Sequence, residues 1–360
     1  MGQPDTTDAA ATSDKDARAG RDAKSLGDRP MMALLGMIHG YWNTQVVRAM
    51  ADLRLADHLA AGPLTAADVA ALESSDPAAT YRLMRACTGL GLLGYEGDGR
   101  FSVTPAGALL RSGVPGSLRD HALAFGAPGH WLPWGQLPEA VRKGVTQAPA
   151  VLGAELFDYL AGQPEESAQF SASMEALTGA LAADAARLID ASCASLAVDV
   201  GGGTGQLVRE LLRINDGLHG MVLDLPAAAD AARQAAEADG LGARFSAASG
   251  DFFAAVPAAD LYLLKAVLHD WDDESCVRIL RNCRDAARPG ARAVVIENVI
   301  RDLTRDRFTA MLDMNMLAVT TGEERDMDSY DALFAASGWQ RTAVHRLPGG
   351  RSLLELRAVG

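Results

Sequence analysis

Residues 196–205 read LAVDVGGGTG, and this stretch decides the fold. Its first half is a short apolar run that predicts a buried strand, and a predicted helix follows at residues 207–214. The glycines between them allow a tight turn from strand to helix and let a ligand approach the backbone. The stretch predicts the opening of a nucleotide-binding α/β domain, although a glycine-rich turn alone is weak evidence because many nucleotide sites use one.

Strand and helix signals alternate from this stretch onward. The later predicted strands occupy residues 221–225, 244–248, 261–267 and 293–297, and the predicted helices between them occupy residues 227–238 and 273–287. This alternation predicts a Rossmann-like α/β domain over residues 191–360, with a mostly parallel sheet covered on both faces. Near the C-terminus, residues 342–346 and 352–358 flank a Pro-Gly-Gly turn, which predicts a terminal hairpin with one antiparallel edge strand.

The N-terminal part of the chain carries a different pattern. Apolar residues recur at helical spacing over residues 31–59, Thr65 is placed to cap the next helix, and Pro77 is placed in the first turn of the helix after it. A Gly-Asp-Gly turn at residues 97–99 then separates two short apolar runs, which predicts a hairpin. Three helices followed by a hairpin are typical of a winged-helix-like domain, here predicted over residues 30–112.

A winged helix allows two interpretations. The candidate recognition helix, residues 78–90, offers only Arg82 and Arg85 for phosphate contacts, which is few for a DNA-binding surface. The other interpretation is an interaction domain that buries apolar surface against a second copy of the chain. We prefer the second and keep a ligand-sensing DNA-binding protein as an alternative.

Two further segments complete the predicted organisation. Residues 1–29 are polar and poor in aromatic side chains, so we expect a disordered tail. Residues 113–190 carry irregular helix signals that predict a helical connector, with one long helix at residues 165–190. Within the connector, residues 126–135 hold two tryptophans among prolines and glycines, which indicates either a rigid aromatic wall or a packed loop.

The composition excludes several classes of protein. The 360 residues include 33 Lys and Arg against 46 Asp and Glu, for a net charge of -13, and 49% are hydrophobic. Such a chain can build a sizeable core in about two domains, and its acidity disfavours a nucleic-acid-binding surface. It shows neither a membrane-spanning apolar run nor a signal peptide, so we expect a cytoplasmic protein. Its four cysteines form no CxxC pair, which predicts free thiols and neither a disulfide framework nor a zinc site.

A carboxylate sharpens the meaning of the glycine-rich turn. Asp224 ends the second predicted strand, where an acid can accept hydrogen bonds from both ribose hydroxyls of a nucleoside cofactor. No Walker A lysine follows the turn, which argues against ATP hydrolysis. NAD and S-adenosylmethionine (SAM) both fit. Leu207 stands where an NAD fingerprint has its last glycine, and the terminal hairpin also favours SAM.

Two more motifs follow later strands. In GDFF, residues 250–253, an acid and an aromatic ring suit an adenine, although an aspartate after a strand is often only a turn cap. In LLKAVLHDWDDE, residues 263–274, His269 lies at the carboxyl edge of the sheet, where its imidazole can act as a general base near neutral pH. Asp272 or Asp273 is explained as the cap of the next helix, so we expect no metal.

Together these motifs resemble the plant-type small-molecule O-methyltransferases, including their bacterial natural-product members. The resemblance covers nearly all of residues 31–360. It rests on VDVGGGTG at 198–205, LDLP at 223–226, GDFF at 250–253, LLKAVLHDWDDE at 263–274 and GEER at 322–325. The chain departs from the family pattern at Asp326-Met327, where the family often has Thr-Glu, and this puts only the packing of that loop in doubt.

The resemblance implies an activity and a role for each site residue. It implies transfer of a methyl group from SAM, which leaves S-adenosylhomocysteine, to a hydroxyl (phenolic by preference) of a small aromatic or polyketide-like product. His269 matches the general base, and Glu297 and Glu324 match the acids that flank and orient it. The residues implied to contact SAM are Gly201, Asp224, Leu225, Asp251, Phe252, Lys265 and Trp271. Those implied to contact the acceptor are Trp134, Phe170, Met174, Asp270 and Met316.

The resemblance also implies partners. The N-terminal domain is implied to pair two copies into a homodimer, and neither nucleic acid nor a membrane is an expected partner. Two other uses of the same scaffold stay open: N-methylation, and decarboxylation or hydroxylation without methyl transfer.

Overall fold

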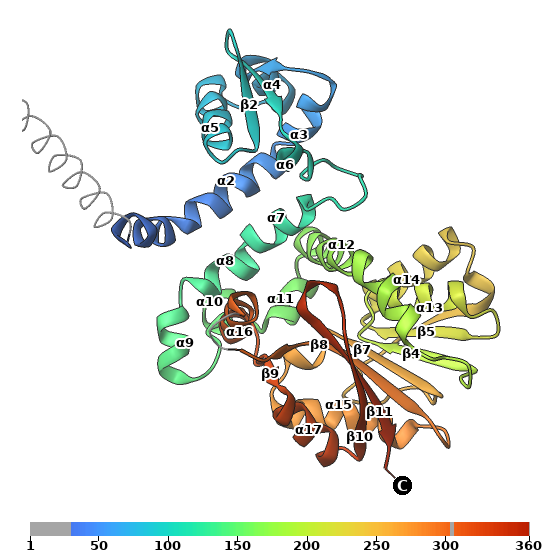
Figure 1. The fold of residues 1–360 in the computed structure, drawn as a ribbon. Coiled ribbons are helices and arrows are strands. Elements are labelled where there is room, and N and C mark those ends of the chain that lie inside the picture. The colour runs from blue at the N-terminus through green and yellow to red at the C-terminus, as the bar shows by residue number, and fades with distance from the viewer. Residues whose placement is uncertain (1–29, 303–305, 360) are drawn as a thin grey trace, which may run out of the picture. The chain divides into compact units, whose positions relative to one another are not determined.

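The computed structural model describes residues 30–302 and 306–359, which form two compact units that divide between Gly107 and Ala108 (Figure 1). The predicted tail at residues 1–29 lies outside the described residues. The first unit holds the helices and hairpin predicted for the N-terminal part. The second unit holds the predicted connector and the α/β domain.

Short helices and a small sheet make up the first unit. Its helices are residues 30–38, α2 (Gly40–Asp52), α3 (Leu55–His58), α4 (Ala66–Glu73) and α5 (Pro77–Gly89), and α6 (Pro105–Ala108) begins at its end. Its three strands are β1 (Leu64–Thr65), β2 (Leu93–Gly97) and β3 (Arg100–Val103), in the order β1-β3-β2. The predicted hairpin is β2 and β3 and is confirmed. Strand β1 was not predicted because a two-residue strand is too short to show a periodic pattern.

Local capping explains where two of these helices begin. Thr65 Oγ1 accepts a hydrogen bond from the backbone N–H of Asp68 at 3.2 Å, and Asp68 Oδ2 accepts one from the N–H of Thr65 at 2.9 Å. This reciprocal pair is a capping box. Asp76 Oδ1 accepts from the N–H of Ala79 at 2.7 Å, and Pro77 stands in the first turn, where a missing N–H costs nothing. The predicted cap at Thr65 and the predicted first-turn position of Pro77 are confirmed.

The second unit begins with six helices. They are α7 (Arg119–Gly126), α8 (Pro128–Trp134), α9 (Leu137–Lys143), α10 (Ala148–Leu152), α11 (Leu156–Ala161) and α12 (Pro164–Leu188). The long helix predicted at residues 165–190 is α12, and the prediction is confirmed within two residues at each end. The segment rich in tryptophan and proline forms the helix α8, with Pro128 at its start, and is not a loop.

A seven-strand path forms the main sheet that follows. Its strands are β4 (Leu196–Val200), β5 (His219–Asp224), β6 (Phe245–Ser249), β7 (Leu261–Lys265), β8 (Arg292–Ile300), β10 (Trp339–Arg346) and β11 (Arg351–Ala358). They lie in the order β10-β11-β8-β7-β4-β5-β6, and the short β9 (Arg325–Asp326) pairs with β8 beside that path. Strands β4 to β8 are parallel to one another, as the alternating sequence pattern predicted.

The terminal hairpin takes a different place from the one predicted. Strand β11 pairs antiparallel with both β8 and β10, so β11 is the reversed strand and lies one place in from the edge. The prediction of a reversed edge strand is wrong in this detail. The cause is burial: Leu353 and Leu354 are fully buried in β11, whereas β10 alternates between covered and exposed residues as an edge strand does.

Helices cover both faces of this sheet (Figure 1). One core cluster packs sheet residues such as Val198 and Leu264 against α15 (Asp273–Ala286) and α17 (Met327–Ala336). The other packs residues such as Leu263 and Ile296 against α12, α13 (Gln206–Ile214) and α14 (Pro226–Ala238). Alternate residues of each strand therefore enter different cores, and the carboxyl ends of the parallel strands share one edge.

Candidate active site

The glycine-rich turn between β4 and α13 needs glycine at two positions. Gly201 has a φ of +66°, and a Cβ built there would lie 3.0 Å from Val267 Cγ2. Gly205, the residue before α13, has a φ of +72°, and its Cβ would lie 2.7 Å from Val222 Cγ2. Only glycine combines such a backbone conformation with such close packing. The turn therefore brings bare backbone to the edge of the sheet.

Asp224 ends β5 beside this turn. Its Oδ2 accepts a hydrogen bond from the N–H of Gly203 at 2.8 Å, and its Oδ1 accepts one from the N–H of Leu225 at 2.7 Å. Burial raises the pKa of Asp224, and the two backbone donors oppose that shift. Each carboxylate oxygen keeps a second lone pair for a ligand hydroxyl. The side chain of Leu225, the next residue, is half exposed.

Unpaired polar groups lie beside the same turn. Among the described residues, no hydrogen bond reaches Asp199 Oδ2 or Gln206 Oε1, although both atoms are buried. Burial raises the pKa of Asp199 to about 7 and lowers that of Lys265, at the end of β7, to about 8. An acid, an amide oxygen and an ammonium group in one place match a zwitterionic ligand. With the Asp224 carboxylate, this donor and acceptor set fits SAM, whose amino-acid end is zwitterionic and whose other end is a nucleoside.

The GDFF turn brings an acid and three aromatic rings together. Asp251 Oδ1 accepts a hydrogen bond from the N–H of Phe253 at 2.8 Å, so the acid caps its own turn. Asp251 also lines a surface hollow with Leu223 and Gly250. The Trp271 ring meets Phe252 and Phe253 edge-to-face at centroid distances of 6.0 and 4.8 Å. The predicted cofactor residues Asp251, Phe252 and Trp271 therefore lie at the same edge of the sheet.

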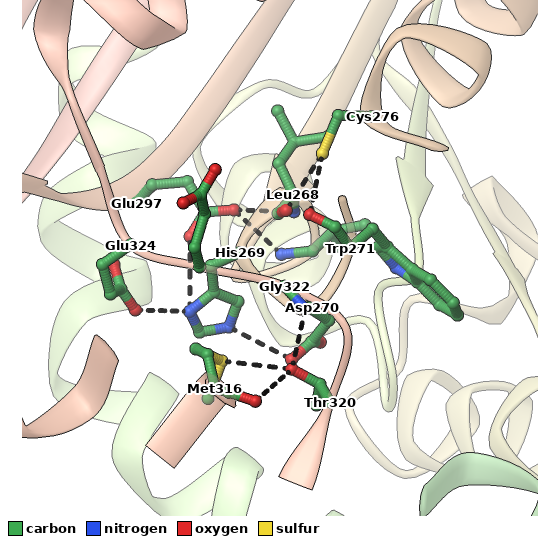
Figure 2. Close-up of polar contacts among 12 residues, drawn as sticks. Leu268, His269, Asp270, Trp271, Cys276, Glu297, Met316, Thr320, Gly322 and Glu324 are labelled. Atoms are coloured by element: carbon green, nitrogen blue, oxygen red, sulfur yellow. Dashed lines mark hydrogen bonds and ion pairs between the residues drawn. The ribbon is translucent and has the colours of Figure 1, made fainter. Parts of the chain in front are cut away.

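His269 stands in a short turn that follows β7. Ala266 has a φ of +52°, which turns the chain out of the strand, and Leu268–Asp270 form one 3-10 turn. The His269 Nδ1 atom lies 2.7 Å from Glu324 Oε1 and 4.0 Å from Glu297 Oε2. Its Nε2 atom lies 3.7 Å from Asp270 Oδ1. Figure 2 shows the imidazole between Glu324 on one side and Asp270 on the other.

The two glutamates hold different parts of this turn. Glu297, in β8, accepts hydrogen bonds on Oε1 from the N–H groups of Val267 and Leu268 at 3.0 and 2.9 Å. Glu324 contacts the imidazole directly. Its backbone N–H donates a hydrogen bond to Asp313 Oδ1 at 2.9 Å, which holds the residue in place. Glu324 therefore orients the ring, whereas Glu297 fixes the backbone under it and adds negative charge from 4.0 Å.

These carboxylates change the acidity of His269. Burial lowers its pKa, but the negative charges of Glu297, Asp270 and Glu324 outweigh burial and raise the pKa to about 9. Burial raises the pKa of Asp270 to about 6 and also raises that of Glu297. Three acids from three parts of the chain therefore hold the pKa of His269 above the ordinary histidine value.

The predicted acceptor residues lie on three helices and the His269 turn. Trp134 and Phe170 pack against the same small core cluster, and Trp134 Nε1 donates to Asn315 Oδ1 at 2.8 Å. Met316, in α16 (Arg307–Val319), is buried, and its Sδ atom lies 3.9 Å from Thr320 Oγ1. Met174 is half-buried on α12. Asp270, the remaining residue, lies next to His269.

A row of rings that sequence reasoning did not assemble runs through the connector. Its members stack or meet edge to face in the order His121, Phe125, His130, Phe170, Phe157, Trp271. They come from α7, α8, α11, α12 and the turn after β7, so no single sequence spacing relates them. The row joins the connector to the turn of His269. Its only signal in the sequence was the aromatic content of these separate segments.

Within residues 30–302 and 306–359, no three His, Cys, Asp or Glu side chains are grouped so as to hold a metal ion. In the same ranges no helix is both long enough and apolar enough to cross a membrane. The cytoplasmic location stays a prediction.

Comparisons with known proteins agree with this geometry. The family model of the O-methyltransferase domain matches residues 134–340. The family model of the O-methyltransferase dimerisation domain matches residues 35–113. The phenazine O-methyltransferase PhzM of Lysobacter antibioticus is 34% identical over 327 residues, 91% of this chain and 96% of that protein. The 8-amino-8-demethylriboflavin N,N-dimethyltransferase of Streptomyces davaonensis is 33% identical over 319 residues, 87% of this chain and 91% of that one.

A solved structure adds the ligands of a relative. NcsB1, an O-methyltransferase from neocarzinostatin biosynthesis in complex with SAM and 2-hydroxy-5-methyl naphthoic acid, has a TM-score of 0.79 and 33% identity. The match covers 88% of this chain and 96% of that one. The chain therefore belongs to the SAM-dependent small-molecule O-methyltransferases that include enzymes of bacterial natural-product biosynthesis, and SAM is its cofactor.

Proposed function

We propose that this O-methyltransferase methylates a phenolic hydroxyl of a small aromatic or polyketide-like natural product, with His269 as general base. The observation that carries the proposal is the His269 site itself. Its Nδ1 is held by Glu324 at 2.7 Å, which leaves Nε2 as the nitrogen for an acceptor hydroxyl. The ring row supports a planar acceptor, as do the naphthoic acid bound to NcsB1 and the phenazine named for PhzM.

The chemistry asked of the chain is removal of one proton and alignment of one oxygen. SAM supplies a methyl group that is already activated by its sulfonium. A phenol has a pKa of about 10, so it needs a base near neutral pH. Neutral His269 accepts the phenol proton on Nε2 as the oxygen attacks, and Glu324 stabilises the resulting imidazolium through Nδ1–H. The buried position of His269 keeps water away and strengthens these interactions.

The cofactor residues named from the resemblance keep their roles as proposals. Gly201 offers backbone to the methionine part of SAM, Asp224 and Leu225 flank the ribose, and Lys265 lines the site. Asp251, Phe252 and Trp271 are proposed for the adenine.

Replacing Asp224 with asparagine should weaken the binding of S-adenosylhomocysteine about tenfold to a hundredfold, because one charged acceptor for the ribose becomes a neutral amide. Isothermal titration calorimetry measures the Kd. Asp230→Asn is the matched control, since that aspartate is exposed on α14 and pairs only with Arg233 among the contacts described. An unchanged Kd for Asp224→Asn contradicts its role at the ribose.

The rate should depend on pH in the direction set by the acids around His269. Because they raise its pKa to about 9 against the effect of burial, the imidazole is largely protonated at neutral pH, and only its minor neutral fraction can act as a base there. At saturating SAM, kcat/KM for the acceptor should therefore rise from pH 6 toward about 9. The positive charge of bound SAM opposes protonation, so the midpoint should lie between the ordinary histidine value of about 6.5 and about 9. A midpoint of the pH profile below about 6.5, the ordinary pKa of histidine, contradicts the arrangement of acids around His269.

The reaction itself is tested by the identity of the product. A matched pair of aromatic acceptors, one with a hydroxyl and one with an amine at the same position, is incubated with SAM and analysed by mass spectrometry and NMR. A gain of one CH₂ on oxygen supports the proposal. Methylation of the amine alone favours the N-methylation alternative, which the riboflavin dimethyltransferase relative keeps open. Loss of CO₂ or gain of oxygen without methyl transfer favours the remaining alternative.

We also propose a homodimer through the first unit. The match to a dimerisation domain at residues 35–113 supports it. Large apolar side chains that are more than half exposed gather at its start, namely Met31, Met32, Leu34, Met37, Ile38, Tyr41 and Trp42. Contiguous apolar surface of this kind is typical of an interface. Sedimentation equilibrium should give twice the mass of the chain, and a monomer at all concentrations contradicts the proposal.

A further inference from the structure

Arg325 is a buried cation directly after Glu324, and the site described so far does not use it. The residue is 2% exposed. Its guanidinium donates to the carbonyl oxygens of Leu268 at 3.1 Å and of Trp271 at 2.8 Å. These two carbonyls stand immediately before and after the pair His269 and Asp270. One side chain therefore donates hydrogen bonds to both ends of the turn that holds the proposed base, His269.

The remaining contacts of Arg325 do not account for its burial. Its Nε donates to Asp273 Oδ1 at 2.8 Å, but the Asp273 side chain is 67% exposed, and an ion pair with an exposed partner stabilises a fold little. Its third carbonyl contact, Glu323 O at 3.3 Å, lies within its own segment. Glu323 Oε1, 3.6 Å from Nε, is also on an exposed side chain. Desolvating a guanidinium is costly, and the two carbonyls at the ends of the turn are the contacts that use its rigid, planar fork of donors.

Two other contacts join the same pair of segments. Gly322 packs directly on the turn, since a Cβ built on it would lie 1.9 Å from the carbonyl oxygen of His269. Glu324 Oε1 reaches His269 Nδ1 at 2.7 Å. Residues 322–325 therefore hold residues 268–271 by backbone contact, by a carboxylate and by a guanidinium. Of these, only the guanidinium contacts both ends of the turn. The Cys276 thiol in α15 also reaches the Leu268 and Trp271 carbonyl oxygens, at 3.1 and 3.5 Å, but a thiol is a weak donor (Figure 2).

We propose that Arg325 is a positioning residue, which fixes the turn of residues 268–271 so that His269 meets Glu324 and the Trp271 ring stays beside Phe252 and Phe253. This proposal rests on the proposed role of His269. Arg325 does not touch the imidazole and acts through the Leu268 and Trp271 carbonyls. A small tilt of that turn moves Nε2 relative to the acceptor oxygen, and a misplacement of about 1 Å can cost about a hundredfold in rate.

The test replaces Arg325 with lysine, which keeps the buried charge but has one ammonium nitrogen in place of the two guanidinium nitrogens that contact Leu268 O and Trp271 O separately. We expect kcat to fall about tenfold to a hundredfold. The Kd for S-adenosylhomocysteine should stay within roughly a few-fold of the wild-type value, because the cofactor contacts are kept. The midpoint of the pH profile should move down toward the ordinary value for histidine, because the ring is no longer held against Glu324. The charged groups facing that ring, Glu297, Glu324 and Asp270, are unchanged in the variant.

Arg281→Lys is the matched control. This exposed arginine also donates to a backbone carbonyl, that of Ala336, at 3.2 Å through Nε and 2.9 Å through a terminal nitrogen. We expect wild-type kcat and pH midpoint from it. If Arg325→Lys does not fold, Arg325→Gln takes its place with the same expectations, since the amide keeps a donor for one carbonyl without a buried charge.

Two results separate this proposal from the proposed function. A folded Arg325 variant that is less heat-stable but keeps wild-type kcat and pH midpoint overturns the positioning role, even if His269→Ala is inactive. If His269→Ala keeps full turnover, the general-base role itself fails. In that case a slow Arg325 variant no longer supports positioning through His269, and the proposal falls with it.

Discussion

Replacing His269 with alanine should lower kcat for O-methylation by roughly 10² to 10⁴-fold, the usual range for loss of a general base. The expectation follows from the position of the ring. Glu324 Oε1 lies 2.7 Å from Nδ1 of His269, and His269 is 8% exposed. Bulk solvent is therefore poorly placed to accept the proton instead of the imidazole. Initial rates at saturating SAM and acceptor, followed by chromatography of the methylated product, measure the loss.

The variant must still bind cofactor for this result to be informative. The cofactor residues lie on the turn after β4 and at the end of β5, so the Kd for S-adenosylhomocysteine should stay close to that of wild type. His345→Ala is the control, because His345 also pairs with a glutamate, Glu355 Oε1 at 2.9 Å, but does so within the terminal hairpin. Full turnover by His269→Ala with cofactor binding intact would reject the base.

The fold was predictable where the sequence is periodic. Strand β4 was predicted with its observed bounds, and α12 within two residues, because each carries a sustained apolar pattern and a clear turn or proline at one end. The order of β10 and β11 was not predictable in the same way. Both strands carry hairpin signals, and only their packing against β8 decides which becomes the inner one. The apolar pair Leu353 and Leu354 in β11 and the alternating residues of β10 are consistent with that choice, but the hairpin signal alone does not make it.

The site was predictable at its edge and less so in its chemistry. The topology of a parallel sheet brings Asp224 and His269 to one edge whatever their neighbours are. Glu324 is 55 residues from His269 in the chain, so their contact at 2.7 Å was available only through the family resemblance. The pKa of His269 depends on three acids from separate segments, and Arg325 acts on backbone carbonyls that every residue possesses. Neither effect leaves a mark in the local sequence.

The turn of His269 is also sensitive to a single added methyl group on the opposite segment. In Gly322→Ala, the new Cβ would lie 1.9 Å from the His269 carbonyl oxygen, 2.4 Å from the Asp270 carbonyl carbon and 2.5 Å from the Trp271 nitrogen. All three atoms belong to backbone, so no side-chain rotation relieves the overlap. We expect the two segments to separate, with a loss of about 1–3 kcal/mol in the free energy of unfolding.

The same displacement should reduce kcat about a hundredfold, because it moves the turn that holds His269 away from Glu324 and from the acceptor. Thermal unfolding and steady-state rates measure the two effects on one preparation. Gly217→Ala is the control, since that exposed glycine has no atom within 4 Å of an added Cβ and lies in the loop after α13. A Gly322→Ala enzyme with wild-type kcat would show that the turn tolerates movement. The position of His269 would then be set by the imidazole's own contact with Glu324 and not by the backbone that carries it.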